Sequence, residues 1–112
     1  MKKITVVFLT AVVAGCAAVP INLGAELVRI TNSEPGKECK FLGDVTGNQG
    51  NFFTGPLTSN ESLETGARND MKNKAAAMGG NVVAILTQRA GHTSSGQQTN
   101  VTLTGNVYRC PE

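Results

Sequence analysis

SLETGARNDMKNKAAAMGGNVVAILT, residues 62–87, contains the clearest helix signal in the chain and, directly after it, a clear strand signal. From Ser62 to Met78, apolar residues recur at spacings of four and three, which places them on one face of a helix. They are Leu63, Ala67, Met71, Ala75 and Met78. Gly79 and Gly80 end this helix, because glycine readily adopts the left-handed backbone of a helix C-terminus.

The two ends of the predicted helix carry suitable polar residues. Ser59 or Asn60 can cap its start, where a side-chain oxygen accepts a backbone N–H. Glu61 lies in or before the first turn and Lys74 lies towards the end, which matches the helix dipole. Gly66 weakens the helix from within, because glycine is a poor helix former.

Two strands are predicted after the helix. Val82 to Leu86 is apolar at nearly every position, which predicts a strand that is covered on both faces and therefore central in a sheet. The last strand alternates apolar and polar residues through Val101, Leu103 and Val107, and it ends at Cys110.

Two further strands are predicted before the helix. Glu26 to Thr31 alternates in hydropathy and predicts the first strand, which a turn at Pro35-Gly36 follows. The second strand is predicted from Cys39 to Gly47, with Cys39, Phe41 and Val45 on one face.

The order of the predicted elements defines the fold class. Residues 48–60 and 89–100 are rich in small polar residues and glycine, and they predict loops. The order β-β-α-β-β predicts an α+β fold in which one helix packs on one face of a small four-stranded sheet. A length of 112 residues with 40% hydrophobic side chains allows one domain, which we assign to residues 26–112.

Composition argues against one class of partner. The chain has ten Lys and Arg against eight Asp and Glu, and two of the positive charges are Lys2 and Lys3. The rest of the chain is neutral in side-chain charge, so no net field would concentrate nucleic acid around it. One Tyr, four Phe and no Trp also provide few surfaces on which bases could stack. We therefore expect no nucleic-acid partner.

The N-terminus has the three-part layout of a secretory signal. Basic residues from Met1 to Lys3 precede an apolar run from Ile4 to Ala14, and small residues follow. A transmembrane anchor is one alternative, but crossing a bilayer takes about twenty apolar residues and this run supplies roughly half of them. A plain secretory signal, cleaved at a small-residue site, is another alternative.

The end of this segment, Val13 to Cys16, resembles the lipobox of bacterial lipoproteins, in which a branched apolar residue and two small ones precede an essential Cys. The resemblance implies that lipid is attached to Cys16 and that the chain is cut between Gly15 and Cys16. Ala17 stands where an acidic residue would resemble the inner-membrane retention signal. The implied location is therefore the outer membrane, with the domain in the periplasm.

The membrane is thus the first expected partner, bound through the N-terminal lipid. Residues 1–15 would be the signal peptide, and residues 16–25 would be the lipidated N-terminus and a short tether. Each buried methylene of an acyl chain contributes about 0.8 kcal/mol, so several chains would hold the protein at the bilayer.

Cys39 and Cys110 are the two cysteines that remain once lipid occupies Cys16. In an oxidising compartment they predict a disulfide, and the alternative is two reduced, buried cysteines that act as small hydrophobic residues. A metal site made of both cysteines and His92 would have at most three ligands, none in a C-x-x-C or H-x-x-x-H spacing. We therefore expect neither a metal nor a cofactor.

A catalytic site is not expected either. His92 lies beside Thr93, Ser94 and Ser95 in a predicted polar loop, where a nucleophile and a base could be imagined. Such a pair also needs an orienting group and oxyanion donors, which a flexible loop holds poorly. An exposed loop histidine is the simpler interpretation, and we identify neither catalytic residues nor a small-molecule substrate.

Phe52 and Phe53 are adjacent aromatic residues in a glycine-rich loop. In one interpretation they fold back onto the sheet as a lid. In the other they are exposed and contact an envelope protein partner or the membrane surface.

Several motifs together resemble a known family. They are Val28-Arg29-Ile30, Cys39 with Leu42-Gly43, GARNDMKNKAAAMGGNVV at residues 66–83 and GNVYRCP at residues 105–111. The set is similar to the YjeI-like family of small enterobacterial lipoproteins, a domain-of-unknown-function family, over nearly the whole mature chain. This resemblance implies no established activity.

A more distant resemblance, in residues 42–47 and in the Ala/Lys-rich helix that runs into Gly-Asn-Val, is to the RcsF outer-membrane lipoproteins, which sense envelope stress. It implies a disulfide-tied α+β domain. RcsF has a long proline-rich linker and four domain cysteines, whereas this chain has nine tether residues and two domain cysteines. We expect a non-catalytic envelope domain that binds or senses a partner, and the alternative is a structural lipoprotein with no specific partner.

Overall fold

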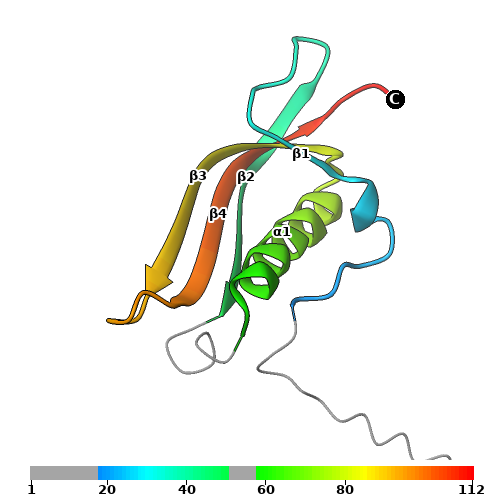
Figure 1. Cartoon of the computed structure of the whole chain (residues 1–112). Coiled ribbons are helices and arrows are strands. Elements are labelled where there is room, and N and C mark those ends of the chain that lie inside the picture. The colour runs from blue at the N-terminus through cyan, green and yellow to red at the C-terminus, as the bar shows by residue number, and fades with distance from the viewer. Residues whose placement is uncertain (1–17, 51–57) are drawn as a thin grey trace, which may run out of the picture.

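A computed structural model describes residues 18–50 and 58–112 of the chain. Its elements are η1 (Ala25–Leu27), β1 (Arg29–Thr31), β2 (Lys40–Gly50), α1 (Asn60–Ala77), β3 (Val82–His92) and β4 (Gln98–Arg109). The strands form one sheet in the order β1-β3-β4-β2, with β1 parallel to β3 and the other neighbours antiparallel. Helix α1 covers one face of this sheet (Figure 1). The predicted α+β fold and its element order are confirmed.

Helix α1 begins directly after Ser59, which caps it. The backbone N–H of Ser62 donates to Ser59 Oγ at 3.0 Å, and the chain leaves the helix through Gly79 at a φ of 84°. Most of the predicted inner face is fully buried, namely Leu63, Ala67, Met71 and Ala75. Met78 directly follows the last helical residue and is 38% exposed, and its Cε atom would lie 3.1 Å from a Cβ atom added at Gly43 of β2.

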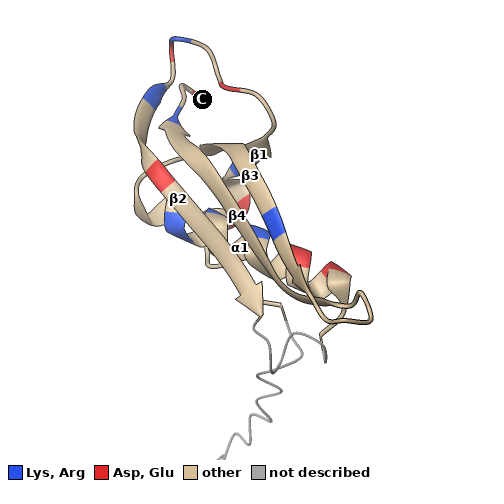
Figure 2. Ribbon diagram, turned by 90° about the vertical axis from the view of Figure 1, so that its left-hand side faces the viewer, with Lys and Arg blue, Asp and Glu red and all other residues tan. Residues whose placement is uncertain are grey.

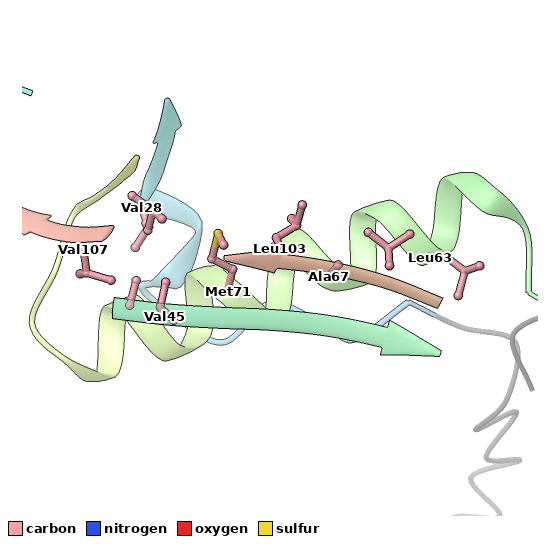
Figure 3. Close-up of a cluster of buried hydrophobic side chains, with 10 residues drawn as sticks. Val28, Val45, Leu63, Ala67, Met71, Leu103 and Val107 are labelled. Atoms are coloured by element: carbon pink, nitrogen blue, oxygen red, sulfur yellow. The ribbon is translucent and has the colours of Figure 1, made fainter. Parts of the chain in front are cut away.

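The hydrophobic core lies between α1 and the sheet (Figure 3). Strand β4 contributes alternate residues to it, and Val101, Leu103 and Val107 are buried as predicted. Helix α1 approaches β2 closely at Gly47, where an added Cβ atom would lie 2.6 Å from the Cβ of Met71. A side chain at this strand position would therefore push the helix off the sheet.

The first strand is shorter than predicted. Residues Ala25–Leu27 form a 3-10 turn that begins after Gly24, and only Arg29–Thr31 pairs with β3. Val28, between the turn and the strand, is buried in the core, whereas Leu27 is 74% exposed. The alternation from Glu26 to Thr31 therefore comes from a turn followed by a short edge strand, and not from one continuous strand.

The second strand extends to Gly50 and contains a β-bulge at Leu42. The pairing with β4 slips by one residue between Phe41 and Gly43. An extra residue reverses the alternation of side chains along a strand. Phe41 is accordingly 54% exposed while Val45 is buried, so the prediction that these two residues share a face is wrong.

Strands β3 and β4 form a long hairpin that turns at residues 93–97, so most of the loop predicted over residues 89–100 is strand. In the sheet, β3 lies between β1 and β4, as its apolar sequence predicts. A bulge at Leu86 leaves that side chain 55% exposed. The prediction of cover on both faces is wrong, because α1 covers only one of them.

The face of the sheet opposite α1 is open (Figure 2). Few charged residues lie along the strands in this view. Thr46 and Thr104 bring their hydroxyl oxygens to 3.5 Å of each other across β2 and β4, and Thr104 also pairs with Thr87 of β3. The middle of this face is therefore polar and bears hydroxyl groups, which explains why β2 and β4 alternate in hydropathy there.

Candidate functional sites at the two ends of the sheet

The first candidate site lies around the disulfide between Cys39 and Cys110. The two sulfur atoms are bonded at 2.03 Å, and the residues are 71 positions apart in the sequence. Cys39 directly precedes β2 and Cys110 directly follows β4, so the bond joins the ends of two paired strands. The predicted disulfide is confirmed over the alternative of two reduced cysteines.

The backbone at Cys110 is also held by the side chain of Asn81. The amide nitrogen of Asn81 donates to the Cys110 carbonyl at 2.9 Å, and its amide oxygen accepts the Cys110 N–H at 2.8 Å. The backbone N–H of Asn81 further donates to the Tyr108 carbonyl at 3.0 Å. Covalent and hydrogen bonds thus fix the C-terminal segment against the start of β3.

An open groove of about 380 Å³ lies beside this fixed segment. Its lining comprises Gly24, Leu27, Val28, Arg29, Gly80, Asn81, Val82, Arg109, Cys110, Pro111 and Glu112. Leu27 offers an exposed apolar side chain, and Arg29 adds a guanidinium group. Arg109 pairs with Glu112 at 3.3 Å. The lining thus combines an apolar side chain with one arginine and one ion pair, which suits binding of a partner. The groove holds no nucleophile with a base beside it.

The second candidate site lies on the helix side of the sheet, where residues 19–22 lie along α1. The carbonyl of Val19 accepts from the Asn69 side chain at 2.8 Å. Asn73 holds the next residues at two points, because it donates to the Pro20 carbonyl at 2.9 Å and accepts the Asn22 N–H at 2.7 Å. We call these contacts, together with that of Gln49 described next, the N-terminal clamp.

Gln49 completes the N-terminal clamp from the sheet. Its side-chain oxygen accepts the backbone N–H of Val19 at 2.7 Å. To reach Val19, the Gln49 side chain lies against the helix at Gly66, where an added Cβ atom would come within 2.7 Å of Gln49 Cδ. The glycine that weakens the helix therefore makes room for a strand residue that binds the N-terminal segment.

The N-terminal clamp changes the description of residues 16–25. The sequence predicts a tether for them, but the structure packs the backbone from Val19 to Asn22 against α1. Sequence reasoning missed this packing because the segment is short and has neither helix nor strand periodicity. One signal was present: Asn69 and Asn73 are four residues apart, so they project from one side of a helix.

Four of the predicted site residues lie outside the described part of the chain. They are Gly15, Cys16, Phe52 and Phe53. The lipidation and cleavage assignments and both interpretations of the aromatic pair therefore stay predictions.

His92 lies within the described residues, but at the end of β3 instead of in a loop. It is exposed and pairs with Gln98 at the hairpin, so the length of β4 separates it from Cys110. The hydroxyl of Thr93 lies 2.9 Å from that of Ser95 and accepts the N–H of Gln97 at 3.2 Å. These contacts close the hairpin turn, and the structure does not bring His92 to the cysteines. Among residues 18–50 and 58–112, no three His, Cys, Asp or Glu gather as metal ligands would.

Comparison with known proteins now places the chain. The family model described as "Domain of unknown function (DUF4156)" matches residues 19–110, which cover every helix and strand of the fold and all of the groove lining except Pro111 and Glu112. The chain belongs to this family. Proteins named "Uncharacterized protein YjeI" from Escherichia coli K12 and from Shigella flexneri are each 39% identical to it over 100 residues, 88% of this chain and 86% of theirs. The family model begins to match at Val19, so residues 19–22, which the N-terminal clamp holds, lie within the family domain of this DUF4156 protein.

Among the described residues, α1 is too polar to be a membrane-crossing helix, and no other helix there is long enough.

Proposed function

We propose that this DUF4156 protein is a lipid-anchored lipoprotein of the outer membrane whose periplasmic domain binds an envelope partner without catalysing a reaction. The motif that ends in Cys16, behind a basic and apolar segment, carries the anchoring part of the proposal. The disulfide between Cys39 and Cys110 supports it, because such bonds persist in oxidising compartments such as the periplasm.

Mass spectrometry of the mature N-terminus tests the anchor. We expect a chain that begins at Cys16 and carries a diacylglyceryl group on its sulfur and an acyl group on its amine. The Cys16→Ser variant should keep its first fifteen residues and lack the lipid. An unmodified Cys16, or a wild-type chain that still begins at Met1, would overturn the lipoprotein assignment.

The groove at the disulfide end supports the binding part of the proposal. It is concave, and it combines the exposed Leu27 with the cation of Arg29 on a backbone that the disulfide and Asn81 hold in place. A rigid and preformed surface loses little conformational entropy on binding, which favours recognition of a specific partner.

Photocrosslinking in intact cells separates a specific partner from a purely structural role. A photoreactive amino acid replaces Leu27 at the groove or, as the matched control, Leu86, an exposed leucine of β3. We expect one discrete adduct from position 27 and none of the same mass from position 86. Diffuse adducts from both positions would favour the alternative, a structural lipoprotein without a specific partner.

A further inference from the structure

The N-terminal clamp limits how the domain can be placed at a membrane. We infer that the domain stands on the lipid surface with the end that carries the β3–β4 hairpin, and that its disulfide end faces away from the bilayer. This inference rests on the proposed function, because it requires lipid on Cys16.

Little free chain separates Cys16 from the docked backbone. Val19 is held at its N–H by Gln49 and at its carbonyl by Asn69. Cys16 precedes Val19 by three residues, so its Cα atom lies within about 11 Å of the Val19 Cα atom even when the chain is fully extended. A tether that was free up to Ala25 would reach about 30 Å.

The docked backbone lies near the hairpin end of the sheet. Gln49 is the last residue but one of β2 and pairs with Val101, near the start of β4. At about 3.3 Å per residue, the sheet extends about 30 Å from Gln49 to Lys40 beside the disulfide. In the other direction, only about 13 Å separate the level of Gln49 from the hairpin turn at Ser94. Figure 1 shows the described N-terminal residues starting near the hairpin end and the C-terminus at the other end.

These lengths favour one orientation. If the disulfide end rested on the bilayer, the lipid on Cys16 would have to cover about 30 Å with a reach of about 11 Å. With the hairpin end on the bilayer, the distance to be covered is about 13 Å, which the extended chain and the lipid linkage together can reach. The groove beside Leu27 then faces the periplasm, where a partner can reach it.

Tryptophan fluorescence can measure the orientation, because the chain contains no natural Trp. Ser94→Trp places a probe at the hairpin turn, and Lys37→Trp places one in the exposed loop before Cys39. Each mature, lipidated variant is reconstituted into phosphatidylcholine vesicles with and without a lipid that carries a spin label on its headgroup. We expect quenching of the probe at position 94 to be at least threefold stronger than quenching at position 37.

A clamp variant tests the cause of this difference. Gln49→Ala with Asn69→Ala and Asn73→Ala removes the side-chain contacts that hold Val19, Pro20 and Asn22, and it leaves alanine, a better helix former, at both positions in α1. The freed chain should let the domain tumble, so the quenching ratio should fall towards one. Asn106→Ala on the open face is the matched control and should keep the threefold ratio.

The outcomes separate this inference from the proposed function. Equal quenching at positions 94 and 37 in a protein with proven lipid on Cys16 would overturn the orientation alone. If the clamp variant keeps the same ratio of quenching at position 94 to quenching at position 37, the clamp does not set the orientation. A Cys16 without lipid, seen by mass spectrometry of the same samples, would overturn the proposed anchor and the orientation together.

Discussion

Single asparagine side chains fix the backbone at both ends of this domain. Asn73 binds a carbonyl and an N–H of the N-terminal segment, and Asn81 binds the carbonyl and N–H of Cys110. A primary amide can do this because it presents a donor and an acceptor side by side, as a neighbouring strand would. Two irregular segments are therefore held without extra secondary structure.

A helix-favouring substitution at Gly66 should not raise the free energy of unfolding as it would elsewhere in a helix. Gly→Ala in a helix interior stabilises by about 1 kcal/mol, but the new methyl group would displace the side chain of Gln49 from its place beside Val19. We expect Gly66→Ala to leave the free energy of unfolding nearly unchanged and to speed hydrogen exchange at the Val19 amide. In the Gln49→Ala background the same change should stabilise by about 1 kcal/mol, as urea denaturation would measure. An equal gain in both backgrounds would contradict the role given to Gln49.

The disulfide should account for a large part of the stability. Replacing both cysteines by serine, as Cys39→Ser with Cys110→Ser, removes a constraint on a loop of 71 residues. The chain-entropy treatment gives a loss of about 4 kcal/mol in the free energy of unfolding. Urea denaturation measures it, and wild-type protein reduced with dithiothreitol should match the double variant. A loss below about 1 kcal/mol would mean that the unfolded chain is already compact.

At the scale of elements, the cap of α1 provides a direct test of the helix boundary. Ser59→Ala removes the acceptor of the Ser62 N–H and should destabilise the domain by about 1 kcal/mol. The sequence alone left Ser59 and Asn60 as equal candidates. Asn60 is the first helical residue, so Asn60→Ala should change stability by less than about 0.5 kcal/mol in thermal or urea unfolding. The reverse ranking would place the start of the helix one residue later.

Elements with a strong hydropathy period could be predicted from the sequence, whereas their irregularities could not. The spacing of Leu63, Ala67 and Met71 and the alternation along β4 follow directly from burial of one face. The bulges at Leu42 and Leu86 leave no such trace, because one inserted apolar residue in an apolar run does not break the pattern. The exposure of Phe41 was therefore mispredicted.

The long hairpin and the N-terminal clamp escaped prediction for a related reason. Beyond Ala90, the end of β3 and the start of β4 contribute no apolar side chain to the core, so their residues are polar and resemble a loop in composition. The contacts of Asn69, Asn73 and Gln49 join residues 30 to 53 positions apart in the sequence, and only the tertiary fold brings them together. The composition of a segment does not predict contacts between residues this far apart in the sequence.

At the scale of the whole molecule, the two ends of the domain differ in structure. The disulfide, Asn81 and the groove lie at one end of the sheet, and the N-terminal clamp lies near the other. Both ends are made rigid by contacts between segments far apart in sequence. Such an arrangement suits a domain that is attached at one end and binds at the other, as the proposed function requires.

The edge of β2 is a possible site of self-association, because the domain has no net side-chain charge to keep copies apart. Strand β2 lies at the edge of the sheet, and edge strands pair readily with other chains. Two residues of α1 cover part of this edge, because Asp70 accepts the N–H of Asn48 at 2.9 Å and Lys74 donates to the carbonyl of Thr46 at 2.8 Å. Asp70 and Lys74 also pair with each other at 3.0 Å.

Removing this ion pair should promote association of the domain. Asp70→Ala with Lys74→Ala keeps the net charge and uncovers the backbone groups of Asn48 and Thr46 for a second chain. We expect the average mass from sedimentation velocity to rise with concentration in the double variant, in a chain that begins at Ala17 and carries no lipid. Glu64→Ala with Lys72→Ala removes the same two charges elsewhere on α1 and should not produce this rise. Equal behaviour of the two variants would mean that charge on the helix, and not cover of the β2 edge, controls association.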